Sequence, residues 1–256
     1  MIQSKTRRTT RKLARPRLIG PPEPINENGR PLSPQESVRR CVYLSALFRE
    51  MYRPMAIAPV DFRQIIDTLT EKKVPFVLTG AHAIGNWTGR PRATHDVDIL
   101  AKGGRNCARA VKALRALYPE LEVRDLTGVT AFFVPGENQS VIDVTFPHRM
   151  DLQVTLETAI WIEDDGRRYR IPTLEAALAN KYGAMLTLSR DPVKRAIDAA
   201  DFAQMVRHSD DPTREPIDMA LLESLGKKVW PSGGGQEILD FVAQARAGIV
   251  PAVLFK

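Results

Sequence analysis

Two aspartates that alternate along an apolar segment give the first sign of chemistry in this sequence. Asp96 and Asp98 stand at positions i and i+2 of the segment 96–100, and on a β-strand such side chains project from the same face. Two carboxylates held this close repel each other unless a cation or a shared proton lies between them. Carboxylate oxygens are ligands that suit Mg²⁺ or Mn²⁺. The pair therefore indicates a divalent-metal site.

A third aspartate strengthens this interpretation. Asp143 lies in the segment 140–146, whose apolar and β-branched residues predict another strand. Asp96 and Asp98 alone would more often be acids on a strand edge that faces water, but an unpaired carboxylate in an apolar strand is costly. If the two strands are neighbours in one sheet, three carboxylates converge, as a two-metal site for phosphoryl or nucleotidyl transfer requires.

Two further positions suggest binding of a phosphate-bearing substrate. Gly80 follows the predicted strand 76–79 and opens a helix-compatible segment, so the backbone amides after it can form an anion nest. A lone glycine there is more often an ordinary turn, but the aspartate strand that follows favours the nest. Lys181 lies among apolar neighbours on a predicted helix, where a lysine either neutralises a phosphate or snorkels at the helix margin.

Other polar residues near these motifs have ordinary explanations as well. Arg195 and Asp198 stand three residues apart on a predicted helix and can form a surface ion pair. His82 and His95 flank the central motif. Because no second histidine or cysteine has a suitable spacing, we expect a structural or substrate-edge role for both, not metal ligation.

The positive charge of the chain is concentrated at its N-terminus. The 256 residues carry a net charge of +7, and seven lysines and arginines precede the first acid, Glu23. The rest of the chain is therefore formally neutral. A basic, disordered tail over 1–32 either binds nucleic acid or acidic surfaces without sequence preference, or only aids solubility, or acts as a transit peptide.

Composition excludes several protein classes. A hydrophobic content of 43% with 26% charged residues is that of an ordinary globular protein, and no apolar segment reaches membrane-spanning length. Cys41 and Cys107 are the only cysteines. Since neither has metal-type spacing, they favour a reducing, cytoplasmic setting.

Hydrophobic periodicity predicts an α/β (α+β) fold with a small mixed sheet flanked by helices, followed by a C-terminal helical region. Helices are expected from the capping box at 33–36, over 60–70 and up to Leu117, and again over 173–186, 193–206, 215–225 and 237–247. Strands are expected at 76–79, 96–100, 121–126, 130–134 and 140–146. A less regular region follows from 148 to 172, with a charged turn at 163–166 and a short strand near 169–171. We divide the chain into the tail 1–32, an α/β core 33–150, a helical domain 151–230 that completes the site, and a glycine-rich joint with a terminal helix at 231–256.

Together these motifs resemble the nucleotidyltransferases of the DNA polymerase β superfamily, and most of all the bacterial AbiE-type toxin and toxin–antitoxin branch. The resemblance covers about 60–206 and implies that Asp96 and Asp98 form the metal pair and Asp143 the third catalytic carboxylate. The family's remaining motif positions, expected to bind nucleotide, match Gly80, Ala81, Arg92, Thr94, Lys181, Arg195 and Asp198. Ala81 departs from the family's Ser or Gly, so a hydroxyl contact to the triphosphate is missing.

The resemblance implies Mg²⁺ or Mn²⁺ as cofactor, a nucleoside triphosphate as substrate, and transfer of NMP to an acceptor hydroxyl with release of pyrophosphate. The acceptor is a tRNA 3′ end, a protein or a small molecule, and a cognate antitoxin is a candidate partner. One alternative is a non-catalytic nucleotide-binding or toxin–antitoxin module with the same fold. Another is a nucleic-acid-binding protein that acts through the basic tail.

Overall fold

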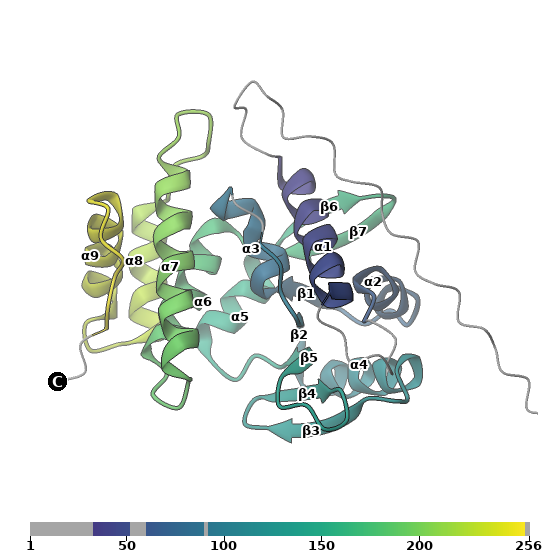
Figure 1. Ribbon diagram of the computed structural model, residues 1–256. Coiled ribbons are helices and arrows are strands. Elements are labelled where there is room, and N and C mark those ends of the chain that lie inside the picture. The colour runs from purple at the N-terminus through teal and green to yellow at the C-terminus, as the bar shows by residue number, and fades with distance from the viewer. Residues whose placement is uncertain (1–32, 52–59, 90–91, 254–256) are drawn as a thin grey trace, which may run out of the picture.

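The structure, a computed structural model, describes residues 33–51, 60–89 and 92–253. The predicted basic tail at 1–32 lies outside the described residues, so its role stays a prediction. Within them, a mixed sheet and its helices lie beside a group of C-terminal helices (Figure 1). No helix in this part of the chain combines the length and the apolar composition needed to cross a membrane.

The main sheet has five strands in the order β1-β2-β5-β4-β3. The strands are β1 (Phe76–Thr79), β2 (Val97–Ala101), β3 (Glu122–Leu126), β4 (Val129–Phe133) and β5 (Ser140–Thr145). The β2–β5 pair is parallel, whereas the other three pairs are antiparallel. The expected small mixed sheet flanked by helices is therefore confirmed.

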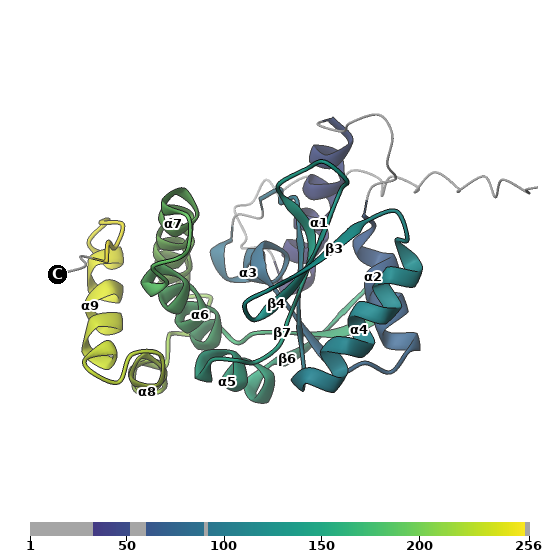
Figure 2. The ribbon, with the colours of Figure 1, turned by 90° about the horizontal axis from the view of Figure 1, so that it is seen from below.

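Alternation along β2 and β5 separates the core from the site. Val97, Ile99, Ile142 and Val144 are fully buried in the first core cluster, whereas Asp98 and Asp143 project from the opposite face because side chains alternate along a strand. Helices α2 (Phe62–Glu71) and α4 (Gly103–Leu117) cover the core face, and the C-terminal helices lie on the other side (Figure 2).

The N-terminal helices form where local signals predicted them. Helix α1 (Pro34–Met51) begins with a capping box, in which the Ser33 amide donates to Glu36 Oε2 at 2.6 Å and the Glu36 amide donates to Ser33 Oγ at 3.2 Å. Helix α2 buries the four predicted residues, Phe62, Ile65, Ile66 and Leu69.

The region from 148 to 172, expected to be less regular, is instead ordered into α5 (Met150–Thr158) and the hairpin β6 (Ile160–Asp164)–β7 (Arg167–Ile171). The predicted turn at 163–166 and strand near 169–171 are confirmed within this hairpin. The helix was missed because its buried face includes an acid. Asp151 has an almost fully buried side chain and pairs with Arg149 at 2.7 Å, which interrupts the apolar pattern. The β6–β7 hairpin packs into the first core cluster through Ile162 and Tyr169.

The C-terminal helices are α6 (Leu174–Leu186), α7 (Pro192–Ser209), α8 (Met219–Val229) and α9 (Gly234–Arg246). Thr173 caps α6 as predicted. Helix α8 begins later than expected because Asp218 is its N-cap. The glycine run at 231–235 was expected to be a flexible joint, but Gly234 belongs to α9. Gly234 also packs closely on α8: a Cβ added at Gly226 would lie 2.3 Å from the carbonyl oxygen of Gly234.

Helix α3 (Gly80–Thr88) joins the two halves of the fold. Ala83 packs in the first core cluster, and the adjacent Ile84 packs in the second, which α6, α7 and α9 form with residues such as Phe202 and Phe241. The N-terminus of α3 therefore lies at the junction between the sheet and the C-terminal helices.

Candidate active site

Three aspartates converge at this junction. Asp98 and Asp143 are directly opposite each other on the parallel strands β2 and β5, and Asp96 immediately precedes β2. One carboxylate oxygen from each residue lies within 4.8 Å of the others. The structure thus brings together the three carboxylates that the sequence pattern singled out.

Gly80 permits the close approach of one of these carboxylates. It follows Thr79, the register partner of Asp98 on β1, and its φ of +63° lies in the left-handed region. A Cβ at this position would lie 1.7 Å from Asp98 Oδ2. The helix that begins here has no side-chain cap at its N-terminus, so its first amides remain available beside the triad.

The substitution Gly80→Ala is expected to displace the Asp98 carboxylate and to strain the backbone, with a loss of stability of about 1–3 kcal/mol. It should also remove the increase in melting temperature that Mg²⁺ gives the wild type. Thermal melts with and without Mg²⁺ measure both effects. Gly104→Ala on α4, where a Cβ would meet nothing within 4 Å, is the matched control. An unchanged response of Gly80→Ala to Mg²⁺ would contradict this role for Gly80.

The electrostatics of the triad favour a bound cation. Burial and the charges of Asp96 and Asp143 raise the pKa of Asp98 well above its usual value. Burial and Asp96 raise the pKa of Asp143 to about 6. Asp143 Oδ1 is buried and has no hydrogen-bond partner among the described residues. Three carboxylates this close together, two of them with a raised pKa, fit a divalent metal such as Mg²⁺ or Mn²⁺.

The raised pKa of Asp143 predicts an unusual pH dependence. Between the usual pKa of 3.8 and about 6, the folded protein binds more protons than the unfolded chain, so metal-free stability should fall as pH rises through this range. From pH 5 to pH 7 the loss is expected to be about 1 kcal/mol larger in wild type than in Asp143→Asn. Chemical denaturation in a metal chelator measures it, and identical pH profiles for the two proteins would contradict it. Mg²⁺ affinity should show the opposite pH dependence: it should decrease as the pH drops below about 6, because the carboxylates must be ionised to bind the metal.

Lys181 lies at the centre of a buried ionic cluster. Its Nζ contacts Asp198 Oδ1 at 2.8 Å and Asp201 Oδ2 at 2.7 Å, and its side chain is only 12% exposed. Burial alone would lower the pKa of Lys181, but the two carboxylates raise it above the usual value. The snorkelling alternative is therefore wrong for this lysine. An ammonium has three donors, so one remains after these two contacts.

Two arginines extend this cluster. Arg190 Nε contacts Asp198 Oδ2 at 2.5 Å, and Arg92 Nη2 contacts Asp201 Oδ2 at 3.2 Å. Burial and the neighbouring aspartates have the largest effects on the pKa of Asp98. The charges of Lys181 and Arg190 come next, and both lower this pKa. The cluster therefore places positive charge next to the triad.

Sequence reasoning missed Arg190 and Lys194. Both lower the pKa of Asp143, so both lie near the triad. Arg190 lies in the loop between α6 and α7, where hydrophobic periodicity gives no signal, and Lys194 is an exposed residue in the first turn of α7. The one available clue was the position of Arg190 between the helix that carries Lys181 and the helix that carries Asp198.

The other predicted residues have separate placements. Thr94 donates a hydrogen bond to Asp96 Oδ1 and so orients that carboxylate. Ala81 is buried on α3, and its carbonyl oxygen accepts from Cys41 Sγ. Arg195 is half-buried on α7 and is not among the main charges that shift the pKa of Asp98 or Asp143.

The two histidines have different placements. His82 is fully buried and stacks on Phe62, with ring centroids 5.1 Å apart and an interplanar angle of 12°. This placement suits a structural role. His95 is half-buried immediately before Asp96.

No family model and no curated protein matches the sequence. An antigenic nucleotidyltransferase-like protein from Paracoccidioides brasiliensis is similar in structure, with 18% identity over 73% of this chain and 91% of its own and a TM-score of 0.43. JHP933 from Helicobacter pylori has 17% identity over 72% and 87% of the two chains, with a TM-score of 0.43.

The Megavirus polyadenylate synthase has 15% identity over 68% of this chain and 37% of its own, with a TM-score of 0.40. The structural neighbours thus include nucleotidyltransferase-like proteins. At these TM-scores the likenesses do not carry a functional assignment, which therefore rests on the site of the chain itself.

Proposed function

We propose that this chain is a metal-dependent nucleotidyltransferase, which transfers NMP from a nucleoside triphosphate to an acceptor hydroxyl and releases pyrophosphate. The observation that carries the proposal is the acidic triad at the uncapped N-terminus of α3, facing the cations of the Lys181 cluster. Carboxylates alone would repel a triphosphate, and cations alone would bind any phosphate. Their combination suits a metal-bound triphosphate.

In this proposal, Asp96, Asp98 and Asp143 hold Mg²⁺ or Mn²⁺. When bound, the metal supplies charge neutralisation at the attacking and leaving oxygens. The first amides of α3, which follow Gly80, bind phosphate oxygens. Thr94 fixes the orientation of Asp96 through its hydroxyl.

The helical part of the chain completes the site. The third donor of Lys181 and the guanidinium of Arg190 bind the triphosphate, and Asp198 and Asp201 keep these cations in position. The α/β core (33–150) then contributes the metal ligands, and the helical domain (151–230) contributes the phosphate-binding cations.

The reaction itself is an in-line displacement. Asp143 takes the proton from the acceptor hydroxyl as that oxygen forms a bond to the α-phosphorus. The bond between the α-phosphorus and its bridging oxygen breaks, and pyrophosphate leaves with that oxygen. The acceptor is a tRNA 3′ end, a protein or a small molecule, and the AbiE-type resemblance adds a cognate antitoxin as a candidate partner.

Ala81 is the observation that favours a second candidate, a nucleotide-binding module without catalysis, because no hydroxyl is present at that position of α3. Calorimetry with a non-hydrolysable triphosphate analogue and Mg²⁺ tests binding, and pyrophosphate release from NTP in the presence of cell lysate tests turnover. The proposed transferase requires both signals in wild type and neither in Asp96→Asn/Asp98→Asn. Binding without pyrophosphate release would support the non-catalytic module.

A further inference from the structure

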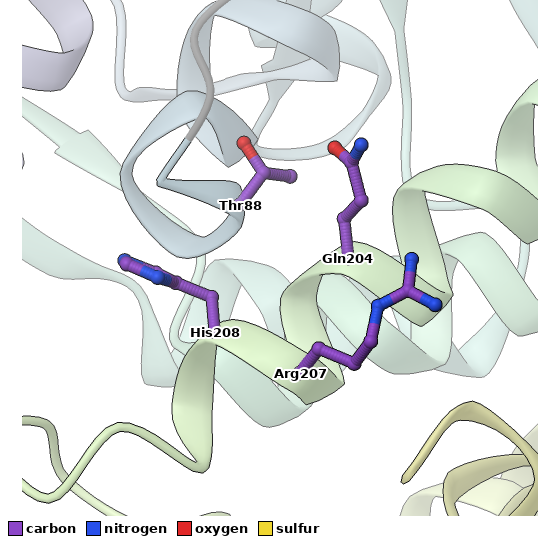
Figure 3. A pocket seen from close by; sticks show the side chains of 4 residues that line it. All are labelled: Thr88, Gln204, Arg207 and His208. Carbon is purple, nitrogen blue, oxygen red and sulfur yellow. The ribbon is translucent and has the colours of Figure 1, made fainter. Parts of the chain in front are cut away.

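A second pocket lies at the opposite end of α3 from the triad. It has a volume of about 400 Å³ and is lined by Thr88, Gln204, Arg207 and His208. Gln204 extends from α7 toward the end of α3 where Thr88 lies, whereas the Arg207 guanidinium lies on the side of Gln204 away from Thr88 (Figure 3). Since α3 spans nine residues from Gly80 to Thr88, the pocket is about 12 Å along α3 from the triad.

The pocket is lined mainly by hydrogen-bond donors and carries an uncompensated positive charge. Among the described residues, no acid pairs with the exposed guanidinium of Arg207. The nearest acids are engaged elsewhere: Asp210 pairs with Arg246 at 3.0 Å, and Asp211 accepts from the amide and hydroxyl of Thr213. Burial and the charge of Arg214 lower the pKa of His208, with Asp211 opposing them.

A guanidinium beside a carboxamide is a donor set that fits phosphate oxygens, whereas the Thr88 hydroxyl already donates to the Gly85 carbonyl oxygen. His208 packs under the turn that ends α3, where its ring would lie 2.4 Å from a Cβ at Gly89. This contact fixes the wall of the pocket. A phosphate bound there would be held mainly by Arg207 and Gln204.

One face of α7 connects this pocket with the triad. This face consists of residues at every third or fourth position, all of them exposed or half-exposed: Val193, Ile197, Ala200, Gln204 and Arg207. Lys194 at the start of this face lies near Asp143. Arg92, 44% exposed, reaches Asp201 from beside it. Cations thus lie at both ends of this face, Lys194 and Arg207, and near its middle, Arg92. The N-terminal half of the face is apolar.

We propose that this pocket is a phosphate subsite for the acceptor, and that the acceptor is a nucleic-acid strand lying along the exposed face of α7. The inference rests on the proposed nucleotidyl transfer at the triad. Cations at intervals match the phosphates of a strand, and the apolar side chains of Val193 and Ile197 give its sugars or bases a surface. This row of cations is not apparent from the net charge, because the chain beyond its basic tail is formally neutral.

Protection of Arg207 from the arginine reagent phenylglyoxal tests the proposal on the full-length protein. A mixed-sequence single-stranded RNA at ten times its Kd should slow modification of Arg207 about tenfold, as measured by mass spectrometry. Arg115 on α4, another exposed arginine at the rim of a pocket, is the internal control and should react at an unchanged rate. Equal modification of Arg207 with and without RNA would overturn the subsite.

Two further arms test the role of Gln204 and separate the two sources of phosphate. Gln204→Ala leaves the charge unchanged and should raise the RNA concentration needed for protection about fivefold. Inorganic phosphate should protect Arg207 only at far higher concentration. Protection by inorganic phosphate but not by RNA would reject the nucleic-acid acceptor.

The protection experiment needs no turnover, so its failure is distinct from failure of the proposed function. Protection of Arg207 in a protein that releases no pyrophosphate would retain the subsite and reject the transferase. Transfer without protection would retain the transferase and reject the subsite. The variant Asp96→Asn/Asp98→Asn should show the same protection as wild type.

Discussion

Asp96→Asn/Asp98→Asn is expected to lower nucleotidyl transfer by about a thousand-fold, since the metal contributes several kcal/mol to the transition state, and yet to fold more stably than wild type without metal. The reason is that burial and mutual repulsion raise the pKa of Asp98, so the ionised carboxylates oppose folding. A gain of about 1 kcal/mol or more is expected in urea denaturation at neutral pH. With Mg²⁺ present, only wild type should gain stability.

Asp240→Asn, an exposed acid on α9, serves as the control and should change neither activity nor the response to Mg²⁺. A double variant less stable than wild type in a metal chelator would show that the triad is held together by interactions within the protein. The metal would then not be needed to explain the cluster.

Lys181→Met is expected to have the second large effect. It leaves Asp198 and Asp201, both buried, without the ammonium that lies 2.8 Å and 2.7 Å from them. Removing one partner of a buried ionic cluster costs about 3–5 kcal/mol, and transfer should be lost because the ammonium proposed to bind the triphosphate is gone. Urea denaturation and the transfer assay measure these two effects.

Lys181→Met/Asp201→Asn separates stability from function. Removal of one of the two carboxylates that faced the ammonium should restore about half of the lost stability, while activity stays absent. This variant also keeps the test decisive if Lys181→Met fails to fold. Lys228→Met, at an exposed lysine on α8, is the control. A Lys181→Met protein as stable as wild type would contradict the role of the cluster.

The carboxylate motif was predictable because its geometry is local. Alternation on a strand fixes the common direction of Asp96 and Asp98, and a second apolar strand supplies Asp143. That β2 and β5 are adjacent and parallel does not follow from either strand alone. It required the family resemblance, which implied that the third carboxylate joins the pair.

The parts of the site that were missed depend on packing between elements far apart in the sequence. Arg190 reaches the triad from a loop between two helices, and no periodic pattern indicates a loop residue. Helix α5 hides an ion pair on its buried face, so its apolar pattern is incomplete. The proposed phosphate pocket requires that the end of α3 meet the C-terminal part of α7, a contact that neither helix predicts by itself.

The central claim is that this chain moves the α-phosphoryl group of an NTP to an acceptor. Wild type is incubated in parallel with NTPs labelled at the α- or the γ-phosphate, with Mg²⁺ and total cellular RNA and protein. We predict that the α-label becomes covalently attached to an acceptor and the γ-label appears in pyrophosphate, with neither in Asp96→Asn/Asp98→Asn. Attachment of the γ-label, or equal attachment of the α-label by both proteins, would contradict the claim.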